Sequence, residues 1–198
     1  MTRPRRIDYP NAIHHVTQRG NDRQLLFETP DDYQVFLDTL ADCVARYRWQ
    51  VLSYCLMPTH VHLVVQTPDA NLSLGMRRLK GSCARKLNAA HHRSGQVFQG
   101  RFESRPIEDE ETLLGALASI ALNPVQAGLS ATPQDWIWGS HAELAGARRP
   151  SGLIAQAEVL DRFATRPATA RARYVRMVAA LANEPEALDA EGDRAGTT

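Results

Sequence analysis

Two hydrophobic periods alternate along most of the chain. Short runs that are apolar throughout, or apolar at every second position, predict strands at 13–19, 49–56, 60–66 and within 98–107. Apolar residues spaced three and four apart predict helices at about 30–47, 72–90 and 108–122. The order β-α-β-β-α-β-α predicts an α+β protein, a ferredoxin-like sandwich with an added C-terminal helix.

The last part of the chain has a different pattern. A segment rich in glycine and other turn-forming residues, 146–152, predicts a linker, and two short helices are predicted beyond it, at 159–163 and 168–181. The sequence from residue 183 is acidic and poor in large apolar residues, which is typical of disorder. We therefore expect one domain over 1–145, a short helical extension over 146–182 and a disordered tail over 183–198.

The distribution of charged residues along the chain is more informative about a partner than the net charge is. The 198 residues carry a net charge of only +1, which neither favours nor excludes a nucleic-acid partner. Between positions 77 and 105, however, many basic residues are accompanied by one acid, Glu103. This pattern is typical of a phosphate-binding surface, although a solvated helix face is the other interpretation. The candidate phosphate contacts are Arg19, Arg77, Arg78, Lys80, Arg85 and Arg101.

Three observations predict where the protein works. Cys43, Cys55 and Cys83 are odd in number and widely spaced, so we expect reduced thiols in a cytoplasmic protein rather than disulfides. No apolar stretch approaches the length of a membrane span, so no membrane partner is expected. The basic residues after Met1 are not followed by the apolar run of a secretory signal.

The motif His60-Val61-His62 carries the strongest chemical signal. Alternate side chains of a strand point to the same face, so the two imidazoles lie side by side while Val61 turns toward the core. Such a pair can hold a divalent metal if a third, oxygen-bearing ligand comes from elsewhere in the fold. The spacing also fits two histidines on a polar strand face, so the surrounding sequence has to decide.

Four longer motifs contain or accompany this pair. They are HHVTQRGN (14–21), YCLMPTHVH (54–62), FQGRF (98–102) and LNPVQAGL (122–129). Together, and in this order, they resemble the single-tyrosine HUH transposases of the IS200 type, and within them the REP-associated tyrosine transposases. The resemblance covers about residues 3 to 145.

The resemblance implies a chemistry. In this family the two histidines, here His60 and His62, bind Mg²⁺ or Mn²⁺ together with a polar residue of a later helix, here Asn123. The metal polarises a phosphodiester of single-stranded DNA, and a tyrosine on that helix attacks it to form a covalent phosphotyrosine. The implied activity is metal-dependent nicking and rejoining of single-stranded or hairpin DNA, by a monomer or a dimer.

The sequence departs from the family pattern at the nucleophile. The tyrosine is expected four residues before the Asn of Asn-Pro-Val, and this chain has Ser119 there. Positions 119 and 123 share one helix face, so Ser119 occupies the catalytic position beside Asn123. A serine hydroxyl is shorter than a phenol and a poorer leaving group, so we expect reduced or lost nicking. Thr59 likewise replaces the Asn expected before the first histidine.

Two functional hypotheses follow. The first is a transposase-family enzyme that nicks and rejoins DNA with the help of a metal. The second is a catalytically silent protein that binds hairpin DNA, and Ser119 favours it. A phosphohydrolase that uses water would need a general base, which the sequence does not reveal.

Overall fold

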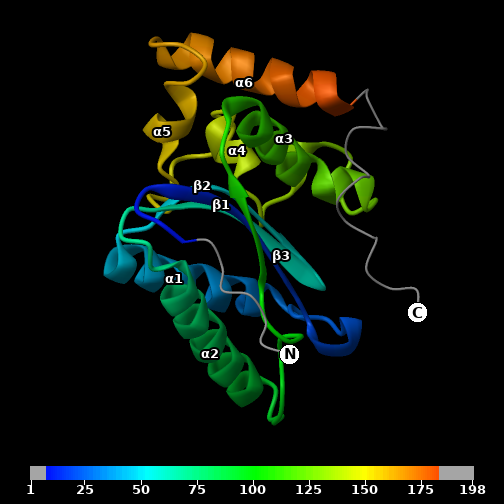
Figure 1. Cartoon of the computed structure of the whole chain (residues 1–198). Coiled ribbons are helices and arrows are strands. Elements are labelled where there is room, and N and C mark those ends of the chain that lie inside the picture. The colour runs from blue at the N-terminus through cyan, green and yellow to red at the C-terminus, as the bar shows by residue number, and fades with distance from the viewer. Residues whose placement is uncertain (1–7, 183–198) are drawn as a thin grey trace, which may run out of the picture.

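The computed structural model describes residues 8–182 and contains a four-stranded antiparallel sheet in the order β2-β3-β1-β4. The strands are β1 (Ala12–Arg19), β2 (Gln50–Met57), β3 (His60–Thr67) and β4 (Glu103–Ile107). Helices α1 (Pro30–Tyr47) and α2 (Leu72–Ala90) cover one face, and α3 (Glu110–Gln126) lies on the opposite side (Figure 1). The predicted α+β class and ferredoxin-like sandwich are confirmed.

The side chains of β3 alternate between two environments. Val61 and Leu63 are completely buried. Val61 shares its face with Gln18 of β1, which donates to the carbonyl of Gln99, and Lys80 of α2 donates to the carbonyl of Gly100, so this is the face that α1 and α2 cover. His60 and His62 point to the other face, which α3 covers only in part, and both are half-buried. The alternation therefore directs the two imidazoles to the side of the sheet that carries α3.

Asn71 joins the two helices on the first face to the sheet. Its Oδ1 accepts a hydrogen bond of 2.7 Å from the indole Nε1 of the buried Trp49, and its Nδ2 donates to the carbonyl of Tyr47 at 3.1 Å. Asn71 immediately precedes α2, so these bonds fix where that helix begins. One turn later Gly75 leaves room for the Trp49 ring, which fixes how closely α2 approaches.

The C-terminal part of the chain lies against the sheet and α3. Its elements are the 3-10 turn η2 (Pro133–Asp135) and helices α4 (His141–Leu144), α5 (Gln156–Leu160) and α6 (Pro167–Ala182); another 3-10 turn, η1 (Asn21–Arg23), follows β1. Helix α6 packs against α3 (Figure 1). Tyr174 of α6 is completely buried, and its hydroxyl lies 3.0 Å from Nδ1 of His141.

Backbone groups of this later segment cover the outer edge of β2. The amide of Leu56 donates to the carbonyl of Trp138 at 3.0 Å, and the amide of Ala155 donates to the carbonyl of Val51 at 2.9 Å. An edge strand presents unpaired amides and carbonyls to other chains. Here those groups are paired within the molecule.

Helix α3 runs further than the sequence predicts. The expected end at about 122 is wrong, because the helix continues through Pro124 to Gln126. Gly128 has a φ of +68°, its amide donates to the carbonyl of Val125, and the amide of Leu129 donates to the carbonyl of Pro124. These two bonds form a Schellman motif, in which a left-handed glycine ends a helix. The glycine, and not the proline, therefore stops α3.

Other boundaries move less. The helices predicted at 159–163 and 168–181 begin earlier, as α5 and α6, and α4 was not predicted because four residues are too few for a periodic signal. The tail predicted from residue 183 lies outside the described residues. The three cysteines are free and buried, as expected. Within residues 8–182, every helix is too short or too polar to cross a membrane.

Candidate metal and DNA site

His60 and His62 form a close pair on β3. Their ring centroids are 5.0 Å apart, and the rings are inclined by 84°. The register of β1 places Arg19 opposite His60 and Thr17 opposite His62. Opposed residues of an antiparallel pair share a face, so all four side chains lie on the side of the sheet that carries α3.

Each imidazole makes its hydrogen bonds through the same nitrogen. Nδ1 of His60 lies 3.0 Å from the hydroxyl of Thr59. Nδ1 of His62 lies 3.2 Å from Nε2 of His15 and 3.3 Å from the hydroxyl of Thr17. A histidine that binds a metal through Nε2 usually donates its Nδ1 proton to a neighbour. The contacts of both rings therefore suit ligands that coordinate through Nε2.

Burial keeps both imidazoles neutral at neutral pH. It lowers the pKa of His60 to about 4, and the nearby Arg19 guanidinium acts in the same direction. Burial also holds the pKa of His62 well below its usual value, with smaller effects from His60, His15 and Arg19. A metal needs the unprotonated ring as its ligand, so no proton would have to be displaced here.

Helix α3 carries the other two residues predicted for the site. Ser119 and Asn123 are both half-buried and one turn apart, and Nδ2 of Asn123 donates to the backbone carbonyl of Ser119 at 3.3 Å. This bond uses the amide nitrogen, whereas a metal would take the Oδ1 oxygen. Among residues 8–182 no cluster of three or more His, Cys, Asp or Glu side chains could hold a metal. The three predicted ligands offer two imidazole nitrogens and one amide oxygen; imidazole suits first-row transition metals, and amide oxygen suits Mg²⁺ and Mn²⁺.

The tyrosines of the chain lie in other places. Tyr33, Tyr54 and Tyr174 are buried in the core, and burial raises the pKa of Tyr54 to about 12. Tyr47 lies at the end of α1, in a pocket on the outer side of α2. Tyr9 precedes β1, whose first residue pairs with the end of β3 remote from His60. None of the five tyrosines occupies the position of Ser119.

The predicted basic residues divide between two faces. Arg19 is exposed on the histidine face, opposite His60. Arg77, Arg78 and Arg85 are exposed on α2, beyond the other face of the sheet. Sequence reasoning treated them as one surface, and the sheet separates them.

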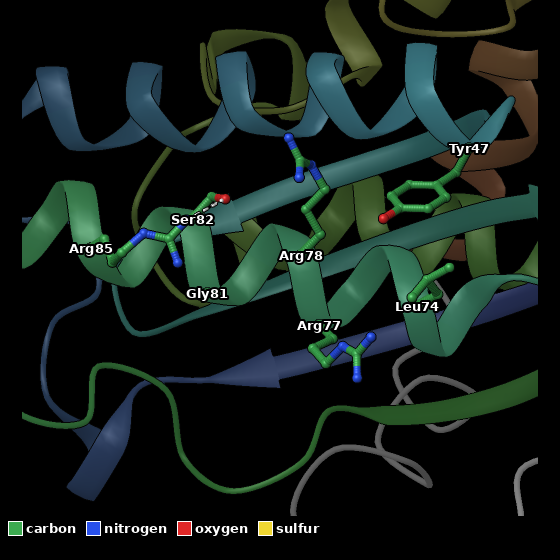
Figure 2. A pocket seen from close by; sticks show the side chains of 7 residues that line it. All are labelled: Tyr47, Leu74, Arg77, Arg78, Gly81, Ser82 and Arg85. Atoms are coloured by element: carbon green, nitrogen blue, oxygen red, sulfur yellow. Dashed lines mark hydrogen bonds between the residues drawn. The ribbon is translucent and has the colours of Figure 1, made fainter.

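Arg77, Arg78 and Arg85 of α2 line a pocket of about 270 Å³ together with Tyr47 and Ser82. Figure 2 shows Arg78 directed toward α1 and Arg77 leaving the helix on another side. Arg85 donates to the hydroxyl of Ser82 at 3.2 Å. We call the exposed side chains Arg77, Arg78 and Arg85 the α2 basic face.

Two further basic residues belong to neither group. Lys80 donates to the carbonyl of Gly100 at 2.7 Å, and its ammonium lies 5.6 Å from the centroid of the Phe98 ring. It therefore ties α2 to the segment that leads into β4. Arg101 is exposed in that segment.

The contact between His15 and His62 was not predicted from the sequence. Nε2 of His15 lies 3.2 Å from Nδ1 of His62. The contact depends on the register of β1 against β3, which the sequence alone does not give. In a ferredoxin-like sheet these strands are antiparallel neighbours, and a register with Thr17 opposite His62 places His15 diagonally next to it.

By fold, this is a ferredoxin-like protein with a histidine pair on a central strand, beneath a helix. The family model described as "Transposase IS200 like" matches residues 8–114, which is 107 of 198 residues. The chain belongs to the IS200-like transposase family.

The proteins similar to the chain include one relative found by sequence and one solved structure. A protein of Haemophilus influenzae described as "Putative REP-associated tyrosine transposase" is 30% identical over 105 residues, which cover 48% of this chain and 60% of that protein. A solved structure described as "Structure of the REP associates tyrosine transposase bound to a REP hairpin" superposes with a TM-score of 0.65 at 20% identity. The superposition covers 76% of this chain and 89% of that one, and it shows the same fold.

Proposed function

We propose that this protein binds single-stranded or hairpin DNA beside a divalent-metal site, and that it forms no covalent DNA adduct. The metal ligands are His60, His62 and Asn123. One observation carries the proposal. Ser119 stands one helical turn before Asn123, where the family pattern has its tyrosine, and the tyrosines of the chain all lie elsewhere. The similar structure bound to a hairpin supports this class of DNA partner.

The side chains of the site have separate tasks in this proposal. A bound Mg²⁺ or Mn²⁺ supplies positive charge at the phosphoryl oxygens. The imidazoles of His60 and His62 offer neutral Nε2 lone pairs, and Asn123 offers its amide oxygen. Arg19 is opposite His60 and exposed, so its guanidinium can pair with a phosphate that approaches the histidines.

The length of the side chain at position 119 decides the chemistry. A serine oxygen is bonded to Cβ, whereas a tyrosine oxygen lies beyond a six-membered ring, several ångströms further from the helix. A displacement of about 1 Å can already reduce a rate about 10²-fold. Serine also makes a poorer leaving group than a phenol, which hinders the rejoining step. Binding without nicking is the expected result.

The second candidate is retained nicking, with the Ser119 hydroxyl as the nucleophile. It is favoured by the neutral histidine pair, which could hold the metal, and by Arg19, whose charge would stabilise the phosphoryl oxygens. It would produce a covalent phosphoserine link to the cut strand. An adduct assay on the wild-type protein separates it from the first proposal.

The test uses labelled single-stranded hairpin DNA, Mn²⁺ and a denaturing gel. Wild type should give no adduct, and Ser119→Tyr should give one that also needs His60. Ser119→Phe is the matched control, since it adds the ring without the hydroxyl. An adduct from wild type that is lost in Ser119→Ala would establish the second candidate instead. Native gels with the same DNA check binding, which the proposal expects for all these variants.

We further propose how the chain is divided and where it acts. Residues 1–145 form the DNA-binding unit, residues 146–182 are a helical extension on α3 and β2, and the protein acts in the cytoplasm. The packing of α5 and α6 supports such an extension. Gel filtration with light scattering distinguishes the monomer from the dimer.

A further inference from the structure

His15 makes an unusual contact for a histidine on a strand surface. Its Nε2 lies 3.2 Å from Nδ1 of His62, and the two ring centroids are 5.5 Å apart. Both residues are half-buried, so the contact is formed beneath a partly open surface. A hydrogen bond between two imidazoles requires one ring to donate and the other to accept.

The chemistry of His62 assigns the direction of this bond. If His62 offers Nε2 to a metal, its proton is on Nδ1, and Nδ1–H donates to Nε2 of His15. The hydroxyl of Thr17, 3.3 Å from the same Nδ1, is the alternative acceptor. His60 has an equivalent arrangement, because its Nδ1 lies 3.0 Å from the hydroxyl of Thr59. Both rings are thus held with Nε2 free of these contacts.

We infer that His15, with Thr17, is a positioning residue that holds His62 in the Nδ1–H tautomer and in the orientation that a metal ligand needs. This inference rests on the proposed metal site. His15 does not act as a third ligand, because its own Nε2 is engaged with Nδ1 of His62. Thr59 has the same task for His60, where the family pattern has an asparagine. The carbonyl of an asparagine could accept the same hydrogen bond.

The alternative is that His15 only fills space beside His62 on this face of the sheet. A phenylalanine at position 15 would keep a ring there and lose the acceptor. A glutamine would lose the ring and keep an acceptor, its amide oxygen. These two variants therefore separate hydrogen bonding from packing.

The first measurement needs no metal. Nitrogen-15 NMR of histidine side chains in the metal-free protein reports which ring nitrogen carries the proton. We expect the Nδ1–H tautomer for His62 in wild type and in His15→Gln. In His15→Phe combined with Thr17→Val, the proton should move to Nε2, which an isolated imidazole prefers. An unchanged tautomer in the double variant would overturn the inference.

The second measurement is the affinity for Mn²⁺ alone, determined by calorimetry with unfolding controls. The double variant should lose affinity by about 10- to 100-fold, the usual effect of removing a residue that orients a ligand. His15→Gln should remain within about threefold of wild type. If wild type binds Mn²⁺ through His60 and the double variant binds equally well, the inference fails and the proposed site stands. If Mn²⁺ binding by wild type does not depend on His60, the proposed site fails, and the inference with it.

Discussion

His141 is a titratable side chain enclosed in the protein away from the site. It is 4% exposed, and its ring contacts the hydroxyl of the buried Tyr174. Burial lowers the pKa of His141 to about 4. The unfolded chain binds a proton at this ring near the ordinary value of 6.5, while the folded protein does not. Its contribution to stability is therefore complete above that value and is lost as the pH falls toward 4.

This residue should make the protein sensitive to mild acid. Between about pH 7.5 and about pH 5.5, we expect His141 to reduce the free energy of unfolding by about 1 kcal/mol. His141→Gln can still bond to Tyr174 but does not titrate. Urea unfolding of both proteins at several pH values gives the difference in slope. Parallel pH profiles would contradict the assignment.

Some residues of the site could be predicted from the sequence, and others could not. The spacing of His60 and His62 requires only strand geometry, and this could be predicted. Ser119 could be placed because positions 119 and 123 share a helix face. His15 could not be recognised as a partner of His62, since that contact depends on the register between two strands far apart in the chain. The separation of Arg19 from the α2 basic face depends on which side of the sheet each helix covers.

At the scale of elements, the long periodic helices and the strands were predicted to within a few residues. The differences are the position at which α3 ends and the short helix α4, which was not predicted. The end of α3 depends on a turn formed after the proline, and proline in a helix is normally a stop signal. The short helix α4 is stabilised by hydrogen bonds to the loop that follows it. Its buried Glu143 accepts hydrogen bonds from Ser151 and Arg148 of the following loop.

The junction between α2 and β2 permits a direct test. A Cβ atom added to Gly75 would lie 2.1 Å from Cζ2 of Trp49, closer than atoms can approach. We expect Gly75→Ala to destabilise the protein by about 1–3 kcal/mol, as overpacked sites do. Chemical unfolding followed by circular dichroism measures the change.

Gly81 is the matched control on the same helix. The nearest atom to a Cβ there is Nη1 of Arg85 at 3.7 Å, an ordinary contact. Gly81→Ala should stabilise α2 by about 0.5–1 kcal/mol, because alanine favours helices more than glycine does. Equal effects of the two substitutions would show that the Trp49 contact does not limit the packing of α2.

At the scale of the whole molecule, the two charged regions lie on opposite sides of the sheet. A DNA hairpin that reached both would have to extend around the edge of the protein. The salt dependence of binding counts how many phosphates the protein neutralises. It can therefore show whether the α2 basic face takes part when DNA is bound near the histidines.

We expect Arg77→Gln with Arg85→Gln to flatten the salt dependence of hairpin binding. The slope should fall by about one unit for each phosphate contact that is lost. Arg166→Gln with Arg176→Gln removes the same charge from exposed positions at and before α6 and should leave the slope unchanged. Fluorescence anisotropy over a series of salt concentrations measures both. If the two pairs behave alike, the α2 basic face is only a solvated surface.

The covered edge of β2 also sets an order of events during synthesis. The carbonyl of Val51 receives its partner from Ala155, about a hundred residues later in the chain. While the ribosome is still making that stretch, the strand has an open side and α3 has no α6 against it. Contacts between such distant residues form late, and the exposed strand can meet other nascent chains in the meantime. A chain released before residue 155 is made would therefore still have unpaired backbone groups on the outer edge of β2, where another strand could pair.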